Sequence, residues 1–284
     1  EIQKTLANDD IVAAVAIRGG AWLTRILPRI DFDVLAKRRR PIALFGFSEL
    51  TPLLNIAATY PKVVAYHDLC PGYLVHGMTH HARQNIAALA PGRQFDAVAA
   101  DAFARGWAAG GFRTEFTRFF EDVTRIIEGK GSTRTLTAEF VRGKPDAGQT
   151  ITVVGGNLTT LITLLGSPYD ALKPEGRWLL IEDVRETPAR VDRMLSHLSL
   201  PGWLQRYEGI MLGDFHDRAG DRTDAVLACL DRHLGKARPP LLVTHDVGHV
   251  WPISPLPIGR PFDLVPTSNR SVDARIPWSC WRTA

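Results

Sequence analysis

Cysteine is scarce in this sequence. The 284 residues contain three, Cys70, Cys229 and Cys280, which lie far apart along the chain. An odd, scattered set of this kind does not suggest a disulfide framework, so a reducing compartment is the simpler interpretation. No apolar stretch is long enough to span a bilayer, and no signal-peptide pattern opens the chain. We therefore expect a cytoplasmic protein with no membrane partner.

The chain also lacks a strong excess of charge of either sign, because Lys and Arg exceed Asp and Glu by only four. Much of that excess comes from the basic residues 37–40, which directly precede a predicted strand. No aromatic ladder accompanies them, so a solvated loop explains this run better than a nucleic-acid site. With 45% hydrophobic and 23% charged residues, the composition is that of an ordinary globular protein of one large or two modest domains.

Predicted strands and helices alternate along the chain, as expected for a parallel sheet with crossover helices. Before a polar linker at 128–134, the pattern predicts strands at 11–17, 42–45 and 63–66, helices at 22–30 and 50–59, and a mostly helical stretch at 72–130. After it, the pattern predicts strands at 136–142, 150–154, 178–181, 209–212 and 241–244, helices at 157–165, 189–198 and 224–233, and a tail of loops and short strands.

A serine occupies the corner between a predicted buried strand and a predicted helix. A Gly-Phe-Ser turn at 46–48 follows the apolar run at 42–45. A glycine two residues before the serine allows the tight turn that lifts the hydroxyl out of the sheet, beside a helix N-terminus. This arrangement is typical of a nucleophile elbow, although Leu50 replaces the second glycine of G-x-S-x-G. The alternative is that Ser48 only caps the helix.

Acidic and histidine side chains follow two further predicted strands. Glu182 and Asp183 come directly after one buried strand, and His249 follows another. Catalytic groups gather at the carboxyl ends of strands in open α/β sheets, and the order serine, acid, histidine is that of α/β-hydrolases. Taken singly, each acid could cap a segment or pair with an arginine, and His249 could lie in the core. The three positions together favour a catalytic serine.

The histidines also allow a metal interpretation, because His245-Asp-Val-Gly-His249 is similar to the H-E-x-x-H zinc motif. That motif needs a helix to bring both imidazoles onto one face, whereas here a strand precedes it and Gly248 lies within it. We therefore expect no metal and keep a zinc hydrolase as a minor hypothesis. The segment Gly155-Gly156-Asn157 lacks the full dinucleotide fingerprint and favours a tight turn that could cradle an anion, so no cofactor is expected.

Five short segments, taken in their order along the chain, form a pattern that can be compared with known protein families. They are Arg18-Gly19-Gly20, Gly46-Phe47-Ser48-Glu49-Leu50-Thr51, Gly155-Gly156-Asn157-Leu158, Ile181-Glu182-Asp183 with Asp192-Arg193-Met194-Leu195, and Gly248-His249 with Leu256-Pro257-Ile258-Gly259. In this order the chain resembles the LD-carboxypeptidase family of serine peptidases, the S66 group that includes the microcin C immunity peptidases. The segments cover nearly the whole chain, and five ordered motifs are far more specific than any one of them.

The resemblance implies a Ser-His-Glu triad. Ser48 aligns with the nucleophile, His249 with the general base, and Glu182 with the acid that orients the histidine. The resemblance also implies an oxyanion hole made by the backbone N–H groups of Glu49 and Gly20. Two such donors beside the serine would stabilise the charge of a tetrahedral intermediate.

The resemblance also implies a substrate class. Family members cleave an amide between an L-centre and a D-residue in murein tetrapeptides, and the immunity branch cleaves peptide–nucleotide conjugates or acyl-sulfamoyl compounds. We therefore expect a small muropeptide-like substrate and a homodimer. A carboxypeptidase must hold the terminal carboxylate, ordinarily with Arg or Lys. Arg18 and Asn157 are the candidate substrate-binding residues, and Arg113 is an alternative.

The fold implied by the resemblance has two α/β domains, residues 1–130 and 131–284. The first carries the nucleophile on a Rossmann- or flavodoxin-like parallel sheet, and the second carries the Glu and His on a mixed sheet. The chain opens at Glu1 without an initiator Met. Because the family's first strand–helix units are absent, we expect either a trimmed chain or a reduced N-terminal domain.

Three departures from the family pattern lie beside the implied site. Ala21 and Trp22 follow the glycine pair, Glu49 replaces the usual Asp, and residues 67–71 replace the usual His-Gly-Pro. These changes do not replace any residue of the implied triad, but they leave the identity of the substrate undetermined. A catalytically silent, ligand-binding homologue is therefore an alternative hypothesis.

Overall fold

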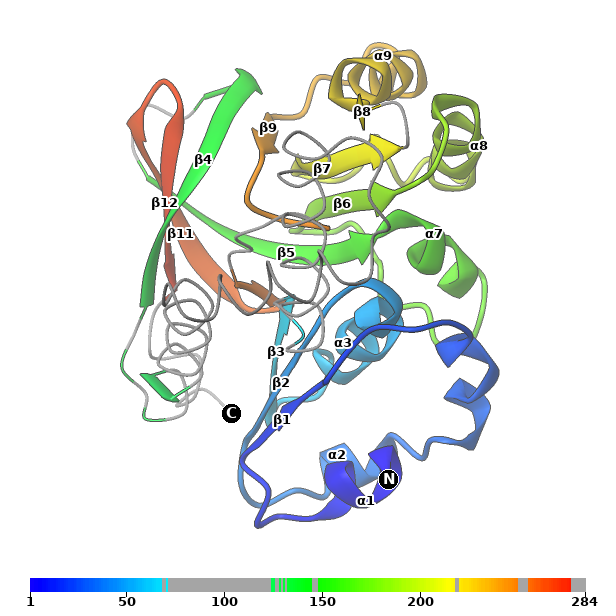
Figure 1. Ribbon diagram of the computed structural model, residues 1–284, viewed down its shortest axis with the longest axis vertical. Coiled ribbons are helices and arrows are strands. Elements are labelled where there is room, and N and C mark those ends of the chain that lie inside the picture. The colour runs from blue at the N-terminus through cyan, green and yellow to red at the C-terminus, as the bar shows by residue number, and fades with distance from the viewer. Residues whose placement is uncertain are drawn as a thin grey trace, which may run out of the picture.

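The computed structural model describes residues 1–67, 70, 124, 125, 128, 130, 132–144, 148–217, 220–249 and 255–276. Its strands form two sheets (Figure 1). In the described part of the chain, one sheet has the order β1-β2-β3-β10 and the other has the order β6-β5-β11-β12-β4-β9-β7-β8. The predicted α/β class, with a parallel sheet and a second, mixed sheet, is confirmed.

The first sheet is parallel except at one edge. Strands β1 (Ala13–Val15), β2 (Ile42–Gly46) and β3 (Val63–His67) run parallel, and β10 (Leu256–Ile258) pairs antiparallel with β3. Every residue of β2 and β3 is buried, which explains their continuous apolar sequences. The helical segments that accompany this sheet are α1 (Ile2–Ala7), η1 (Leu23–Arg25), η2 (Leu27–Arg29), α2 (Asp33–Ala36), η3 (Ser48–Leu50) and α3 (Thr51–Ala57).

The second sheet closes on itself. β6 pairs with β7 as well as with β5, so the strand pairings form a ring to which β8 adds a short hairpin. Strands β5, β6, β7 and β9 run parallel, whereas β4, β11 and β12 have antiparallel neighbours. The bounds are β4 (Ser132–Arg142), β5 (Gln149–Asn157), β6 (Trp178–Val184), β7 (Gly209–Asp217), β8 (Gly220–Asp221), β9 (Leu241–Thr244), β11 (Pro261–Ser268) and β12 (Ser271–Ile276).

Helices cover the outer side of the parallel part of this sheet (Figure 1). They are α7 (Leu158–Leu161), the 3₁₀ turn η4 (Ile162–Leu164), α8 (Pro188–Ser199) and α9 (Thr223–Leu234). Helix α8 buries an apolar stripe at helical spacing, formed by Val191, Met194, Leu195 and Leu198. None of the described helices has the length and apolar character needed to cross a bilayer. The cytoplasmic location and the homodimer stay predictions.

Two sequence predictions in the first half are wrong in detail. The helix predicted at 22–30 is a pair of 3₁₀ turns, because Pro28 cannot donate the hydrogen bond that a continuous helix needs there. The strand predicted at 11–17 is only β1, and Ile17 is 75% exposed. Most of the predicted helical stretch at 72–130 lies outside the described residues.

In the second half, residues 155 and 156 belong to strand β5 rather than to a turn. The tail, predicted to form loops and short strands, contains strands β11 and β12 of eight and six residues, which pair as an antiparallel hairpin. The domain boundary at 130 stays a prediction, and β10 crosses it by pairing with the first sheet.

Candidate active site

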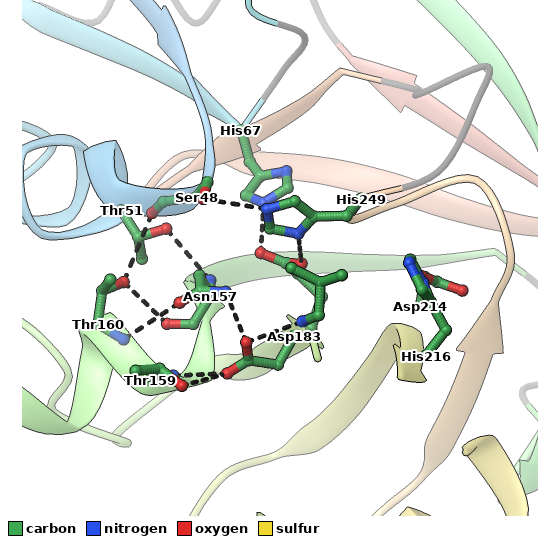
Figure 2. A network of polar contacts seen from close by, with 12 residues as sticks. Ser48, Thr51, His67, Asn157, Thr159, Thr160, Asp183, Asp214, His216 and His249 are labelled. Carbon is green, nitrogen blue, oxygen red and sulfur yellow. Dashed lines mark hydrogen bonds and ion pairs between the residues drawn. The ribbon is translucent and has the colours of Figure 1, made fainter. Parts of the chain in front are cut away.

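Three side chains from distant parts of the chain meet where strands of both sheets end. The Oγ atom of Ser48 lies 3.0 Å from Nε2 of His249 (Figure 2). The Nδ1 atom of the same ring lies 2.8 Å from Oε2 of Glu182. One imidazole therefore connects a hydroxyl to a carboxylate, the relation that an activated serine requires.

The serine lies on a strained corner. Strand β2 ends at Gly46, and Ser48 begins η3 with a φ of 57°, in the left-handed region that non-glycine residues rarely adopt. A Cβ atom on Gly46 would lie 3.2 Å from Cβ of Leu50 and 3.3 Å from Cβ of Ala16. The glycine predicted to permit the turn is therefore needed because the chain folds back closely on itself.

A second close approach brings the histidine to the acid. Gly248 has a φ of 120°, and a Cβ there would lie 3.1 Å from Cβ of Glu182 and 3.2 Å from its Oε2. Gly213 is similarly crowded, because its Cβ would lie 2.7 Å from the carbonyl oxygen of Val247. These glycines let the loop that carries His249 pass directly over the carboxylate.

Helix α3 fixes the serine corner to the second sheet. The Asn55 side chain donates to the carbonyl of Gly155 at 2.9 Å and accepts from the Gly155 N–H at 2.8 Å. Thr51 Oγ1 accepts from the N–H of Asn157 at 3.1 Å. A Cβ on Gly156 would lie 2.8 Å from that same hydroxyl oxygen. The helix that follows Ser48 is thus bonded to β5, the neighbour of the strand that carries Glu182.

Comparison with known proteins identifies the family. A model of the LD-carboxypeptidase N-terminal domain matches residues 1–68, and a model of the LD-carboxypeptidase C-terminal domain matches residues 151–264. Together they span well over half of the chain. The chain belongs to the LD-carboxypeptidase family.

Two relatives carry names from the two branches of this LD-carboxypeptidase family. The probable murein peptide carboxypeptidase of Bacillus subtilis is 27% identical over 267 residues, covering 91% of this chain and 70% of the relative. The microcin C7 self-immunity protein MccF of Escherichia coli is 26% identical over 269 residues, covering 91% of this chain and 72% of the relative.

Solved structures share the fold. Muramoyltetrapeptide carboxypeptidase from Oxalobacter formigenes matches with a TM-score of 0.64 and 21% identity, covering 97% of this chain and 81% of that one. MccF in complex with glutamyl sulfamoyl guanosine matches with a TM-score of 0.65 and 19% identity, covering 98% and 79%. At this level of identity the likeness concerns the fold alone.

The electrostatics of this LD-carboxypeptidase family member favour an ionised acid. Burial alone would raise the pKa of Glu182, but the charge and hydrogen bonds of His249, aided by His67, lower it to about 2. Burial acts to lower the pKa of His249, and the Glu182 carboxylate outweighs that effect and raises it above its usual 6.5. The carboxylate therefore strengthens the imidazole as a base.

The neighbouring Asp183 faces a different group of residues. Its carboxylate accepts from Nδ2 of Asn157 at 3.1 Å, from Oγ1 of Thr159 at 2.7 Å and from two backbone N–H groups (Figure 2). Burial and the charge of Glu182 raise the pKa of Asp183 to about 6. Of the two acids that sequence left open, Glu182 is the one that contacts His249.

Of the glycine pair that follows the first strand, Gly19 lies beside the serine. A Cβ on Gly19 would lie 3.5 Å from Oγ of Ser48 and 3.8 Å from the backbone nitrogen of Glu49, whereas one on Gly20 would meet nothing within 4 Å. The carboxylate of Glu49 accepts from the N–H of Leu23 at 2.6 Å. In the described part of the chain, the Glu49 N–H has no hydrogen-bond partner. The roles of Glu49 and Gly20 as oxyanion donors stay predictions.

The two candidate substrate-binding residues have different surroundings. Arg18 is exposed, next to Gly19, and it forms no ion pair with a described residue. Asn157 is 5% exposed and caps helix α7, where its side chain accepts from the N–H of Thr160. Because the same amide also donates to Asp183, its visible contacts are structural. Arg113 lies outside the described residues.

The zinc hypothesis gains no support from the arrangement. His245 is exposed, and His249 contacts Ser48 and Glu182. Over the described ranges, no group of three His, Cys, Asp or Glu side chains is placed to hold a metal ion.

Sequence reasoning missed several residues that support the site. Asn55 is buried on a helix that is otherwise almost entirely apolar, and that lone amide was the available signal. His67 ends strand β3 fully buried, and its Nε2 lies 3.7 Å from Oε1 of Glu182. Asp214 accepts a hydrogen bond from His216 and donates its backbone N–H to Val247 at 2.8 Å. No sequence spacing connects His67 or Asp214 to the serine, because these two residues come from separate strands.

Proposed function

We propose that this protein is a serine carboxypeptidase that hydrolyses an amide next to a D-residue, as in a murein tetrapeptide. The observation that carries the proposal is the continuous contact from Ser48 through His249 to Glu182. Family membership and the named relatives support the substrate class. The partner is accordingly a small peptide, and the chemistry requires no metal or cofactor.

The mechanism assigns one role to each side chain. Ser48 Oγ attacks the scissile carbonyl carbon while Nε2 of His249 accepts its proton, and Glu182 stabilises the imidazolium through Nδ1–H. The backbone N–H groups of Glu49 and Gly20 stabilise the oxyanion. Collapse of the tetrahedral intermediate expels the amine, which takes the proton from Nε2. Water, activated by the same imidazole, then hydrolyses the acyl-enzyme.

A second candidate is an immunity-type peptidase that acts on a peptide–nucleotide conjugate or an acyl-sulfamoyl compound. The similarity to MccF over 91% of this chain favours it, because that identity is close to that of the murein peptide relative. Both candidates use the same serine chemistry, so they differ only in what binds beside Gly19 and Ser48.

Labelling with a fluorophosphonate probe tests the shared chemistry, with peptide mapping of the adduct. We expect one adduct on Ser48, lost in Ser48→Ala and strongly slowed in His249→Ala. Parallel hydrolysis of a murein tetrapeptide and of a glutamyl sulfamoyl nucleoside then separates the two candidates by kcat/KM. Binding of either compound without turnover or labelling would instead support the silent homologue.

A further inference from the structure

The catalytic acid has one oxygen without a hydrogen-bond partner. Glu182 is fully buried, and its Oε2 contacts Nδ1 of His249. Its Oε1 is also buried and makes no hydrogen bond among the described residues. An unpaired buried carboxylate oxygen is costly, and a carboxylate held at only one oxygen can rotate away from its histidine.

The polar group that faces this oxygen is a second histidine. His67 Nε2 lies 3.7 Å from Glu182 Oε1, and the ring is fully buried (Figure 2). Neither ring nitrogen of His67 has a hydrogen-bond partner in the part of the chain that the structure describes. Two buried groups of complementary chemistry, a possible N–H donor and an acceptor oxygen, therefore face each other.

The fold holds His67 in this place from several sides. Its backbone pairs with Gly46 of β2 on one side and with Leu256 of β10 on the other. The Phe47 ring meets the imidazole edge-on at 6.0 Å. A Cβ on Gly156 would lie 3.1 Å from Cδ2 of His67, so the glycine there leaves room for the ring. An imidazole fixed in this way loses little freedom when it forms a hydrogen bond.

We propose that His67 is a positioning residue that donates from Nε2–H to Oε1 of Glu182, so that the acid is held between two imidazoles. This inference rests on the proposed function. The distance of 3.7 Å between His67 Nε2 and Glu182 Oε1 is longer than a hydrogen bond. Contacts of this kind in active sites often shorten only when the substrate or the transition state is bound. When His249 gains a proton, the carboxylate must stay fixed on Nδ1, and a donor on the other oxygen prevents its rotation.

The arrangement also couples the two sheets. His67 comes from the first sheet together with Ser48, whereas Glu182 and His249 come from the second part of the chain. Correct docking of the sheets therefore places the acid between its partners at the same time as it places the serine on the base. Asp183, Asp214 and His216 are further titratable groups that act on His249, and none of them forms a hydrogen bond or ion pair with His67 among the described residues.

Three substitutions separate positioning from simple space-filling. In His67→Gln the amide nitrogen takes the place of Nε2, in His67→Asn it falls short of that place, and His67→Leu has no donor. We expect His67→Leu and His67→Asn to slow fluorophosphonate labelling of Ser48 by about 10- to 100-fold, as small displacements of a catalytic group do. We expect His67→Gln to stay within about fivefold of the parent, with thermal melting used to show that each variant is folded.

A second readout does not depend on turnover. The proton between Nδ1 of His249 and Glu182 should give a far-downfield ¹H NMR signal in the parent and in His67→Gln, and a shifted or broadened one in His67→Leu. The pH at which labelling is half-maximal should fall in His67→Leu, because a less well-placed carboxylate supports the imidazolium less. Parental labelling, signal and pH profile in folded His67→Leu would overturn the inference while leaving the proposed function intact. A parent that never labels on Ser48 would overturn both.

Discussion

The space beside Ser48 gives a sharp prediction for two adjacent glycines. In Gly19→Ala the new methyl carbon would lie 3.5 Å from the serine Oγ and 3.8 Å from the Glu49 nitrogen. An oxyanion bound by the Glu49 N–H must approach that nitrogen to about 2.7–3.1 Å. The methyl group therefore competes with the tetrahedral intermediate for the same space.

The expected decrease in the labelling rate of Gly19→Ala follows from the loss of one hydrogen bond to the oxyanion. Displacing one such donor lowers the rate by about 10²- to 10³-fold, or roughly 3–4 kcal/mol of transition-state stabilisation. Gly19 does not have a positive φ, and the nearest atom to its new Cβ is at 3.3 Å, so we expect the free energy of unfolding to change by less than about 1 kcal/mol.

Gly20→Ala is the matched control, because its Cβ would meet nothing within 4 Å and its N–H is retained. The assay is the second-order rate constant of fluorophosphonate labelling, measured beside urea unfolding for both variants. We expect Gly20→Ala to label within about twofold of the parent, as a substitution without contacts should. Equal rates for the two variants, or an unaffected Gly19→Ala, would refute the placement of the oxyanion in this space.

Three other outcomes follow from the site. Ser48→Gly should be more stable to urea than Ser48→Ala by about 1 kcal/mol, because glycine adopts the positive φ without strain, and equal stabilities would contradict the strained corner. Labelling should fall as pH drops through the raised pKa of His249, because the protonated ring cannot accept the serine proton; a midpoint below 6.5 in the pH–rate profile would contradict this. Asn55→Leu should lower the free energy of unfolding by about 2–4 kcal/mol, because it leaves two Gly155 backbone groups unpaired, whereas Thr59→Val, which removes only a hydroxyl bonded within its own turn, should cost under about 1 kcal/mol.

The parts of the fold that could be predicted from sequence are short strands whose consecutive residues are all buried. The strands at 42–45, 63–66, 178–181 and 241–244 are covered on both faces, so their sequences are continuously apolar and could be read directly. The closure of the second sheet depends on the pairing of β6 with β7 and on a hairpin near the C-terminus. Such long-range pairings leave no periodic signal in the sequence.

From the sequence, the candidate site could be predicted as a set of side chains at or near the carboxyl ends of strands. Ser48 and His249 each follow a recognisable strand, Glu182 lies near the end of one, and family resemblance chose among the alternatives. The prediction of a turn at Gly155 and Gly156 is wrong because these glycines meet a packing need within strand β5 rather than a need to bend the chain. Gly155 is required by a close approach to Leu180, and a Cβ there would lie 2.0 Å from its carbonyl oxygen. A packing constraint of this kind appears only when two strands and a helix are in place.

The pairing of β10 with β3 matters to anyone who divides this chain into fragments. A cut at residue 130 would separate the antiparallel partner of β3 from the sheet it completes. The shortened piece would present the free edge of a fully buried strand to solvent, where a second copy could add to it. A fragment in which a short linker joins residues 256–258 to the first half would keep that edge covered. A circularly permuted chain is therefore a better way to rearrange the two halves than separate expression.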